Sequence, residues 1–246
     1  MNVTTRATVQ EIREVTPSLF LVTLRPETIR PWDPGMFLQL TLEDVDWSRP
    51  WPPSKPFSFA SWGGDHIRLL IRKEGQFTSR LIENARPGLT LTVKYPFGDL
   101  VLDRPAKYCL VAGGAGISPF LSFLDFYLGR ELTLPAVVIH SIRRREELVS
   151  EIYWEKIPDS IKILPRVTGE YPPPDPDRRL DISAALREAG VRDDTWQFVV
   201  SGPPQFAAKY GRSLSDAGFK HIQLESWQGG VVGSFQPGPA EGVLQT

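Results

Sequence analysis

The sequence predicts two domains: an antiparallel Greek-key β-barrel at the N-terminus, followed by an α/β domain with a parallel sheet. Two observations carry this prediction. Over the first hundred residues, short apolar runs alternate with turns rich in proline and glycine, as in small antiparallel barrels. From Lys107 onward, strand-like and helix-like segments alternate, which is typical of a parallel sheet. We place the domains at 1–103 and 104–227, followed by a tail at 228–246.

The predicted strands of the first domain are short segments in which apolar and polar residues alternate. They are residues 7–15, 19–24, 36–42, 57–61, 66–72 and 89–93. The segment 49–56 is dense in proline and is interpreted as a loop, because proline lacks the N–H group that a helix needs. One short helix is predicted at 75–83, with Gln76 or Thr78 near its cap, and a turn at 95–99.

The second domain is predicted from apolar runs that are followed by helical patterns. Its strands are 108–112, 136–141, 161–166, 196–201 and 221–224, and its later helices lie around 145–152, at 182–189 and at 205–217. Residues 171–176 are expected to form a proline-rich loop. The last residues, 229–246, are rich in glycine and proline, so we expect a tail without a helix or strand.

The composition excludes several classes of protein. The 246 residues are 41% hydrophobic, enough for one large or two medium cores, and the net charge of -1 argues against a general nucleic-acid binder. No apolar run approaches the length of a membrane span, and the first residues do not resemble a signal peptide, so we expect a cytoplasmic protein. The single cysteine, Cys109, is expected to be a small core residue and rules out an internal disulfide or four-cysteine cluster.

A glycine turn follows the strand at 108–112. It contains Gly113, Gly114 and Gly116, and Pro119 then stands where a helix would begin, a position where its missing N–H costs nothing. A strand, a glycine turn and a helix N-terminus together leave backbone N–H groups that attract phosphate. The spacing departs from the common dinucleotide pattern, because Pro119 replaces its third glycine and no acidic residue follows the next strand.

Four motifs occur in a fixed order along the chain. They are Lys55-Pro-Phe-Ser58, Gly75-Gln-Phe-Thr-Ser79, Gly113–Pro119 and Ser201-Gly-Pro203. In this order they resemble the ferredoxin–NADP reductase superfamily, flavoprotein reductases in which a flavin-binding barrel precedes a nicotinamide domain. The family's flavin motif is an arginine, any residue, a tyrosine and a serine or threonine. Variants with proline and phenylalanine in the middle occur in branches related to ferric reductases.

The resemblance implies that the barrel binds FAD, in preference to FMN. Lys55 would pair with the flavin pyrophosphate as a point charge, because lysine lacks the arginine fork. After Pro56, Phe57 would lie against the isoalloxazine ring, although a core aromatic is an equal alternative from this residue alone. Ser58 would lie near N5, the atom that accepts the hydride.

The pyrophosphate would also be held at the start of the barrel's helix. Helix N-termini favour anions, because their first N–H groups are unpaired and the helix dipole is positive there. The residues concerned are Gly75, Gln76, Phe77 and Thr78, with the hydroxyl of Thr78 or Ser79. An ordinary capped helix is the alternative for this segment.

In the second domain, the resemblance implies that the glycine turn takes the pyrophosphate of NADPH or NADH. The residues concerned are Gly113, Gly114, Gly116, Ser118 and Pro119. Ser201, Gly202 and Pro203 resemble the family's cysteine-glycine-proline turn beside the nicotinamide, with serine in place of cysteine. Glu225-Ser-Trp227 resembles the glutamate, any residue, aromatic ending of plant-type members, although Trp227 is not terminal here. We expect Ser58, Ser201 and Glu225 to lie where the hydride moves.

The donor is predicted from basic residues after two strands. Arg143, Arg144 and Arg145 follow one strand and Arg166 ends the next, so together they could hold the 2′-phosphate of NADPH. The alternative is an ordinary solvated charge run, which leaves NADH open. We expect no metal site, and each of the three histidines, His66, His140 and His221, is expected to be structural.

The resemblance implies an NAD(P)H-dependent flavoprotein reductase. Its electrons would pass from FAD to a separate acceptor: a ferredoxin, a flavodoxin, an oxygenase component, ferric iron or free flavin. Two alternatives stay open, an electron-transfer subunit docked on a catalytic partner and a binding module that keeps the fold without flavin. A last expectation concerns the tail. Because 19 residues follow Trp227, and Phe235 is among them, Trp227 and the tail are expected to fold over the FAD.

Overall fold

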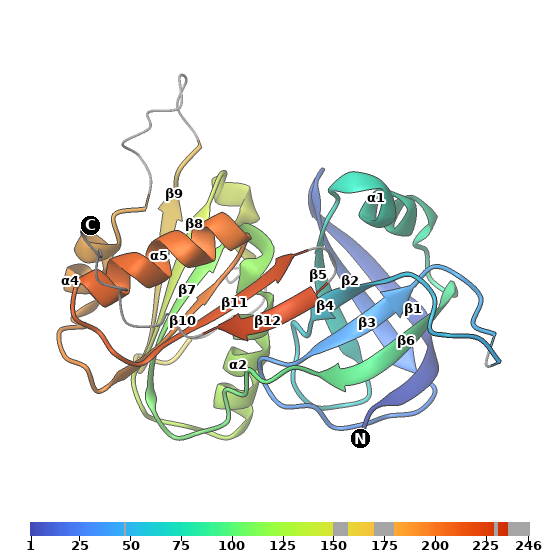
Figure 1. Cartoon of the computed structure of the whole chain (residues 1–246), viewed down its shortest axis with the longest axis horizontal. Helices are drawn as coiled ribbons and strands as arrows, with labels where there is room; N and C mark the ends of the chain where they lie inside the picture. Colours follow the sequence, from blue (N-terminus) through green and yellow to red (C-terminus); the bar gives the residue numbers. More distant parts are fainter. Residues whose placement is uncertain (47, 150–156, 170–179, 229–230, 236–246) are drawn as a thin grey trace, which may run out of the picture.

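The computed structural model describes residues 1–46, 48–149, 157–169, 180–228 and 231–235. The described chain forms two sheets that lie side by side, the N-terminal one from β1 to β6 and the C-terminal one from β7 to β12 (Figure 1). This is the predicted order of an antiparallel domain followed by an α/β domain with a parallel sheet. The boundary at residue 103 stays a prediction; it lies between the end of β6 at Phe97 and the start of β7 at Lys107.

The first sheet has the strand order β4-β3-β6-β1-β2-β5, and all its pairs are antiparallel. Its elements are β1 (Val3–Thr16), β2 (Leu19–Pro26), β3 (Phe37–Thr41), β4 (Ser54–Ser58), β5 (Ile67–Arg72), α1 (Gly75–Asn84) and β6 (Thr90–Phe97). A bridge between Phe59 and Leu69 joins the chain after β4 to β5, the two strands at the ends of the sheet. The non-consecutive neighbours and this closure make the domain a Greek-key barrel.

Some predicted strand boundaries in the barrel are wrong. Strand β4 begins at Ser54, inside the segment predicted as a loop, and ends at Ser58 instead of residue 61. Pro56 fits there because β4 stands at the edge of its sheet, where a missing N–H is tolerated. Strand β6 continues through the predicted turn to Phe97, which pairs with Phe37 of β3. In both places a partner strand extends the element beyond its local sequence signal.

The second sheet has the order β12-β11-β10-β7-β8-β9, with every pair parallel except β11 and β12. Its elements are β7 (Lys107–Gly113), η1 (Gly114–Ile117), α2 (Ser118–Gly129), β8 (Ala136–Ile142), η2 (Arg145–Glu147), β9 (Ile161–Val167), α4 (Ile182–Ala189), β10 (Trp196–Ser201), α5 (Pro204–Asp216), β11 (Ile222–Gln228) and β12 (Val231–Phe235). Two apolar clusters involve the strands of this sheet. One of them includes residues of α2, and the other includes residues of α4 and α5.

The predicted tail without an element is wrong for Val231–Phe235. This segment forms β12, which pairs antiparallel with β11 from Gln228↔Val231 to Leu224↔Phe235. Strand β11 is correspondingly longer than predicted, because β12 satisfies its outer backbone groups. Of the helix predicted around 145–152, the described residues contain the 3₁₀ turn η2 and one α-helical residue, Val149, and residues 150–152 lie outside the described part. The predicted loop 171–176 and the rest of the tail also lie outside it.

One of the apolar clusters contains residues of both domains. The cluster under α2 includes Leu19, Ala60 and Leu70 of the barrel together with Phe120 and other residues of α2. A polar contact reinforces this junction: the Ser61 carbonyl of the barrel accepts a hydrogen bond from Ser122 Oγ of α2 at 2.8 Å, and also one from Trp32 Nε1 within the barrel at 2.8 Å. The barrel and the sheet are therefore held against each other through α2.

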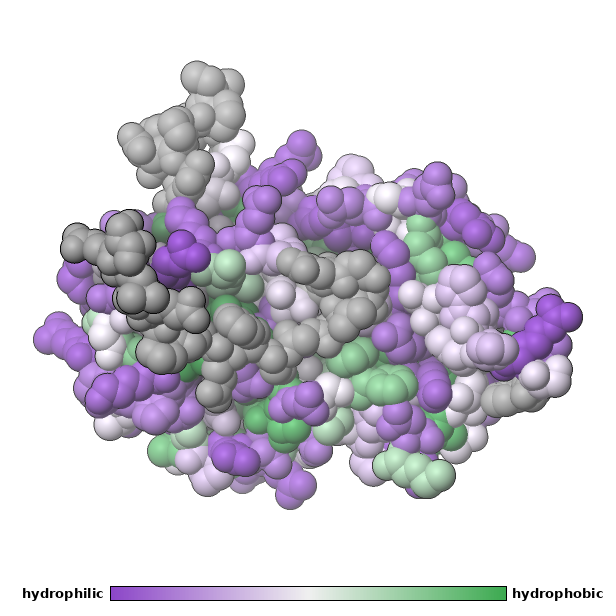
Figure 2. All heavy atoms as spheres, viewed as in Figure 1, coloured by the Kyte–Doolittle hydropathy of each residue, from purple (hydrophilic) through white to green (hydrophobic). Residues whose placement is uncertain are grey.

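The surface seen in this orientation is mostly hydrophilic, with apolar residues in small separate areas (Figure 2). The exposed large apolar side chains among the described residues are Met1, Ile29, Leu134 and Val167, which lie far apart along the chain. None of the helices in the described ranges is long and apolar enough to cross a membrane.

Candidate cofactor-binding site

The glycine turn lies at the point where the order of the second sheet reverses. Strands β8 and β9 continue on one side of β7, and β10 and β11 continue on the other. In open α/β sheets, ligands bind at the carboxyl ends of the strands on either side of such a point. Here those ends carry Gly113 and Ser201, which are followed by η1 and by Gly202. The structure therefore brings two of the predicted motifs together.

These two turns touch closely. A Cβ atom at Gly116 would lie 2.5 Å from the Ser201 carbonyl oxygen and 2.7 Å from Gly202 Cα. At Gly113 it would lie 2.9 Å from the Phe206 ring. Gly114 has a backbone φ of 54°, a conformation that residues other than glycine rarely adopt. The glycines thus let the two turns pack closely together, and the half-buried Gly114 is the one that a ligand could approach.

The helix after the turn begins without a side-chain cap among the described residues. Pro119 lies in the first turn of α2, as predicted. The hydroxyl of Ser118 donates to the Ala115 carbonyl at 2.8 Å, so it stabilises the passage from η1 into α2. The predicted role of Ser118 at the cofactor stays a prediction.

A row of residues crosses the second sheet next to this junction. His140, Ala112, Ser201 and Glu225 occupy one register on β8, β7, β10 and β11. Ser201 is fully buried, Glu225 is 2% exposed, and Ser201 Oγ has no hydrogen-bond partner among the described residues. A buried hydroxyl without a partner costs free energy, so Ser201 is a candidate for binding a polar ligand group. The row shares its face with Ala112 and Val199 of the cluster under α2.

The flavin motif and the barrel helix also meet. Lys55 Nζ lies 5.9 Å from the centre of the Phe77 ring, and the Phe57 and Phe77 rings are 6.3 Å apart. Phe57 packs partly against the barrel core, while Ser58 at the end of β4 is buried. Pro56 lies opposite Gln39 of β3. Strand β4 and the start of α1 therefore form one surface.

Thr78 does not leave its hydroxyl free for phosphate. Its Oγ1 donates to the Glu74 carbonyl at 2.6 Å and accepts from the Glu74 N–H at 2.8 Å. This bond holds Gly75 in its left-handed conformation, with a φ of 75°, at the start of α1. The backbone of Gly75, Gln76 and Phe77 and the half-buried Ser79 are the groups that could meet a phosphate here.

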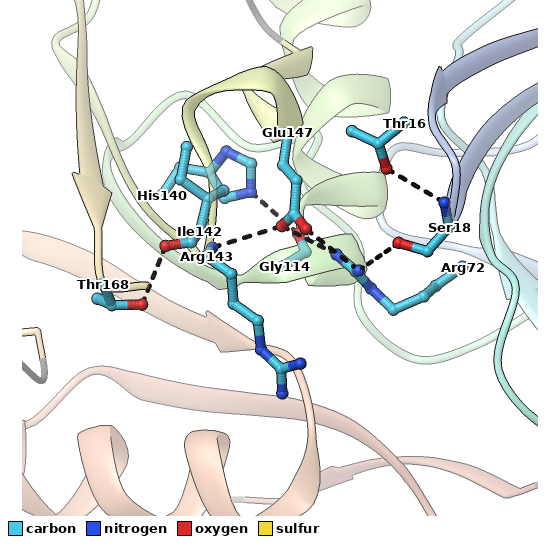
Figure 3. A network of polar contacts seen from close by, with 9 residues as sticks. All are labelled: Thr16, Ser18, Arg72, Gly114, His140, Ile142, Arg143, Glu147 and Thr168. Atoms are coloured by element: carbon cyan, nitrogen blue, oxygen red, sulfur yellow. Dashed lines mark hydrogen bonds and ion pairs between the residues drawn. The ribbon is translucent and has the colours of Figure 1, made fainter. Parts of the chain in front are cut away.

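The predicted arginine cluster is only partly assembled. Arg143, Arg144 and Arg145 are exposed at the end of β8. Arg166 instead forms an ion pair with Glu188 and donates to the Pro165 carbonyl at 3.0 Å. The Arg143 side chain points away from the neighbouring polar network (Figure 3).

This network contains three residues that sequence reasoning did not assign to the site. Arg72 from the end of β5 in the barrel reaches Glu147 of η2 in the second domain, with Nη1–Oε1 at 3.3 Å and Nη2–Oε2 at 3.1 Å (Figure 3). His140 Nε2 lies 2.9 Å from the Gly114 carbonyl oxygen. Nothing local marks these residues, because Arg72 and Glu147 are 75 positions apart in the chain.

His140 is a neutral hydrogen-bond donor in this network. Burial lowers its pKa to about 4, although the bond to Gly114 and the nearby Glu147 act in the opposite direction. Because the Gly114 carbonyl can only accept, Nε2 carries the proton. Nδ1 is buried without a partner among the described residues. His140 therefore holds the glycine turn from the neighbouring strand.

Most of the second domain matches a known protein family. Residues 110–211 match the model of the oxidoreductase NAD-binding domain. The chain is 32% identical over 119 residues to the probable dihydroorotate dehydrogenase B (NAD(+)), electron transfer subunit, of Methanopyrus kandleri, covering 48% of this chain and 42% of that protein. It is 29% identical over 136 residues to the 2-halobenzoate 1,2-dioxygenase electron transfer component of Burkholderia cepacia, covering 53% and 38%. The chain thus spans less than half the length of these two relatives.

Solved structures share the whole architecture. The ferredoxin reductase in carbazole 1,9a-dioxygenase superposes with a TM-score of 0.77 at 22% identity, over 92% of this chain and 70% of that one. A ferredoxin NADP+ reductase from Neisseria gonorrhoeae with bound FAD and NADP gives 0.76 at 20% identity, over 91% and 98%. The fold and site define a two-domain protein with a barrel and an oxidoreductase NAD-binding domain. The chain is similar in sequence to electron transfer components of other enzymes and similar in fold to these ferredoxin reductases.

Proposed function

We propose that this protein is a flavin-dependent NAD(P)H oxidoreductase that passes electrons through FAD to a separate acceptor. One observation carries the proposal: the buried, unpartnered Ser201 hydroxyl stands beside the two touching glycine turns at the switch point of the sheet. On the barrel side, Lys55 and Phe57 of β4 meet the start of α1. Backbone N–H groups, a cation and aromatic rings are the groups that dinucleotide cofactors need.

At the barrel, the chain supplies charge and a flat surface. Lys55 is exposed and can neutralise one phosphate, and the first N–H groups of α1 can hold the other. Phe57 and Phe77 offer aromatic faces, and Ser58 offers a hydroxyl at the end of β4. These residues fit FAD.

At the second domain, the chain supplies close backbone approach and a polar row. The glycines at 113, 114 and 116 let a pyrophosphate approach the start of α2. Ser201 and Glu225 lie side by side in register and are shielded from water, so they can orient a polar ring against the barrel. When bound, the nicotinamide supplies a hydride and the flavin accepts it, so the protein has only to bind, orient and exclude water.

The donor and acceptor are finer parts of the proposal. With Arg166 paired to Glu188, the case for NADPH rests on Arg143, Arg144 and Arg145 at the end of β8. For the acceptor we propose a small electron-carrier protein, an oxygenase component, ferric iron or free flavin, and for the location we propose the cytoplasm. A role as the electron-transfer subunit of a larger complex is a second candidate, because two relatives are named as such components.

The absorbance spectrum of the purified protein tests the main proposal. We expect flavin bands that bleach on anaerobic addition of NADPH, and more slowly on addition of NADH. Equal rates and affinities for both donors would remove the role of the arginines. A colourless protein that takes up no FAD on reconstitution would overturn the proposal as a whole.

Replacing Lys55 by alanine should weaken FAD binding. The change removes a charge-assisted contact of about 1.5–3 kcal/mol, which corresponds to roughly one to two decades in the dissociation constant. Flavin fluorescence titration of the apoprotein measures this constant. Lys220→Ala, a surface lysine of the other domain that faces Asp194, is the matched control. Equal FAD affinity in the two variants would contradict the assignment of Lys55.

Truncation after Trp227 should loosen FAD and speed reduction by the donor. The truncation removes β12, whose backbone pairs with β11 and lies beside β4, the strand of the flavin motif (Figure 1). The truncation also removes Phe235, the aromatic residue of the tail that we expect to cover the flavin. Loss of one such stacked ring costs about 0.5–1.5 kcal/mol, or roughly 2- to 12-fold in FAD affinity. FAD titration and stopped-flow reduction measure the two effects. Unchanged values for both would show that the tail does not cover the flavin.

A further inference from the structure

The Arg72–Glu147 ion pair joins the two domains at a place where both predicted cofactor turns begin. Arg72 ends β5 and precedes Gly75, the first residue of α1, by three positions. Glu147 lies in η2, just after β8, whose His140 holds the Gly114 carbonyl. Figure 3 shows the guanidinium between the barrel and the glycine turn.

This contact is built into the fold. Glu147 is 5% exposed, and its carboxylate takes two N–H groups of Arg72 and also the Arg143 backbone N–H, at 3.4 Å. On the other side, Arg72 Nη1 lies 3.5 Å from Ser18 Oγ at the β1–β2 turn. A buried carboxylate is costly without such partners, and a two-point contact fixes both distance and orientation. Exposed ion pairs at the surface fix neither the distance nor the orientation of the elements that they join.

The pair also borders the glycine turn directly. A Cβ atom at Gly114 would lie 3.4 Å from Arg72 Nη2. Apolar packing under α2 already holds the domains together, but such packing is not directional. The ion pair adds a fixed separation between the start of α1 and the turn at Gly114.

We propose that Glu147 is a positioning residue for hydride transfer. By holding Arg72, it sets the flavin-side turn against the nicotinamide-side turn, so that the two rings meet in a reactive arrangement. The inference rests on the proposed function and adds to it a residue that touches neither cofactor motif. Reaction rates are sensitive to this kind of alignment, because a displacement of about 1 Å can cost roughly 100-fold.

Glu147→Gln tests the proposal, with Glu146→Gln as the matched control. The control is the preceding residue of the same 3₁₀ turn and is exposed. We expect E147Q to keep its FAD content and to lower the limiting rate of flavin reduction by about 10- to 100-fold. The control should react as the unaltered protein does. A wild-type limiting rate in E147Q would overturn the proposal. Tighter donor binding in E147Q would also overturn it, because the carboxylate would then be a competitor of the donor.

A charge exchange separates positioning from simple loss of a cation. R72E alone should be slow, and the double variant R72E/E147R should recover part of the lost rate. No recovery would count against the proposal. If E147Q does not fold, E147D can replace it, because it keeps the charge on a shorter side chain. We expect E147D to reduce the flavin at an intermediate rate. A wild-type rate in E147D would contradict the proposal that the length of the Glu147 side chain sets the position of Arg72.

A readout without activity completes the test. A double-mutant cycle with R72A and E147A in urea unfolding should show a coupling of about 10-fold or more in the unfolding equilibrium constant. Additive effects would show that the two residues do not act together. Failure of the proposed function looks different: the unaltered protein would then bind no flavin or resist reduction, while the coupling in unfolding would persist.

Discussion

Gly116→Ala should nearly abolish flavin reduction by NAD(P)H while leaving FAD bound to the barrel. The added Cβ would lie 2.5 Å from the Ser201 carbonyl oxygen and 2.7 Å from Gly202 Cα, and both of these are backbone atoms. Neither can rotate away, so the two turns at the carboxyl ends of β7 and β10 must separate. We expect the donor-dependent rate to fall by about 100-fold or more, and the free energy of unfolding to fall by about 1–3 kcal/mol.

Gly211→Ala is a control with a similar clash of another kind. Its Cβ would lie 2.6 Å from Leu224 Cδ2, the end of a side chain that can change rotamer. Gly211 is in α5, away from the turns, so a comparable loss of stability should leave flavin reduction close to that of the unaltered protein. Stopped-flow reduction and urea unfolding of both variants measure this. Donor affinity and rate that survive in G116A would contradict the placement of the nicotinamide site.

Acidification from pH 6.5 to pH 4 should remove about 3 kcal/mol of stability through His140, since each pKa unit is worth about 1.36 kcal/mol. In the unfolded chain, His140 has its ordinary pKa of 6.5, whereas burial lowers the pKa to about 4 in the folded protein. Between these values the unfolded state binds the proton first. The contribution is therefore fully present above pH 6.5 and is lost as the pH falls toward 4.

Urea unfolding between pH 7 and pH 4.5 measures this effect. His140→Gln can keep a donor near the Gly114 carbonyl. Its free energy of unfolding should depend less on pH than that of the unaltered protein. His221→Gln, at an exposed histidine, is the matched control. Glu147 raises the pKa of His140, against the effect of burial, so the same experiment on E147Q reports the share of Glu147. Parallel pH curves for H140Q and the unaltered protein would show that His140 is not buried as a neutral group.

Much of the second domain could be predicted because its signals are local. Helix α4 is found at the predicted residues 182–189; Asp181 accepts from the Ala184 N–H at its start, and Gly190 ends it with a φ of 79°. The glycine turn is recognisable in the same way, since glycine tolerates its conformation and proline suits the first turn of a helix. Such features need only residues within a few positions of one another.

Where an element depends on a partner, prediction from the sequence was wrong. Strand β4 starts inside a proline-dense segment because β3 pairs with it, and β12 forms in a stretch rich in glycine because β11 offers an open edge. The hydroxyl of Thr78 donates a hydrogen bond to the Glu74 carbonyl, and Arg166 forms an ion pair with Glu188. A residue's type shows what it can bind, but its partner is decided by what lies beside it.

By itself, the sequence determined the order of the two domains, the glycine turns and the motifs of β4 and α1, because each is written in neighbouring residues. Only the tertiary structure decided which residues meet across the domains. His140 of β8 and Arg72 at the end of β5 meet at Gly114, Glu147 of η2 holds Arg72, and Ser201 lies beside Glu225 through strand register. These contacts arise from how the barrel packs on the sheet through α2, and packing joins residues whose separation in the chain carries no local signal.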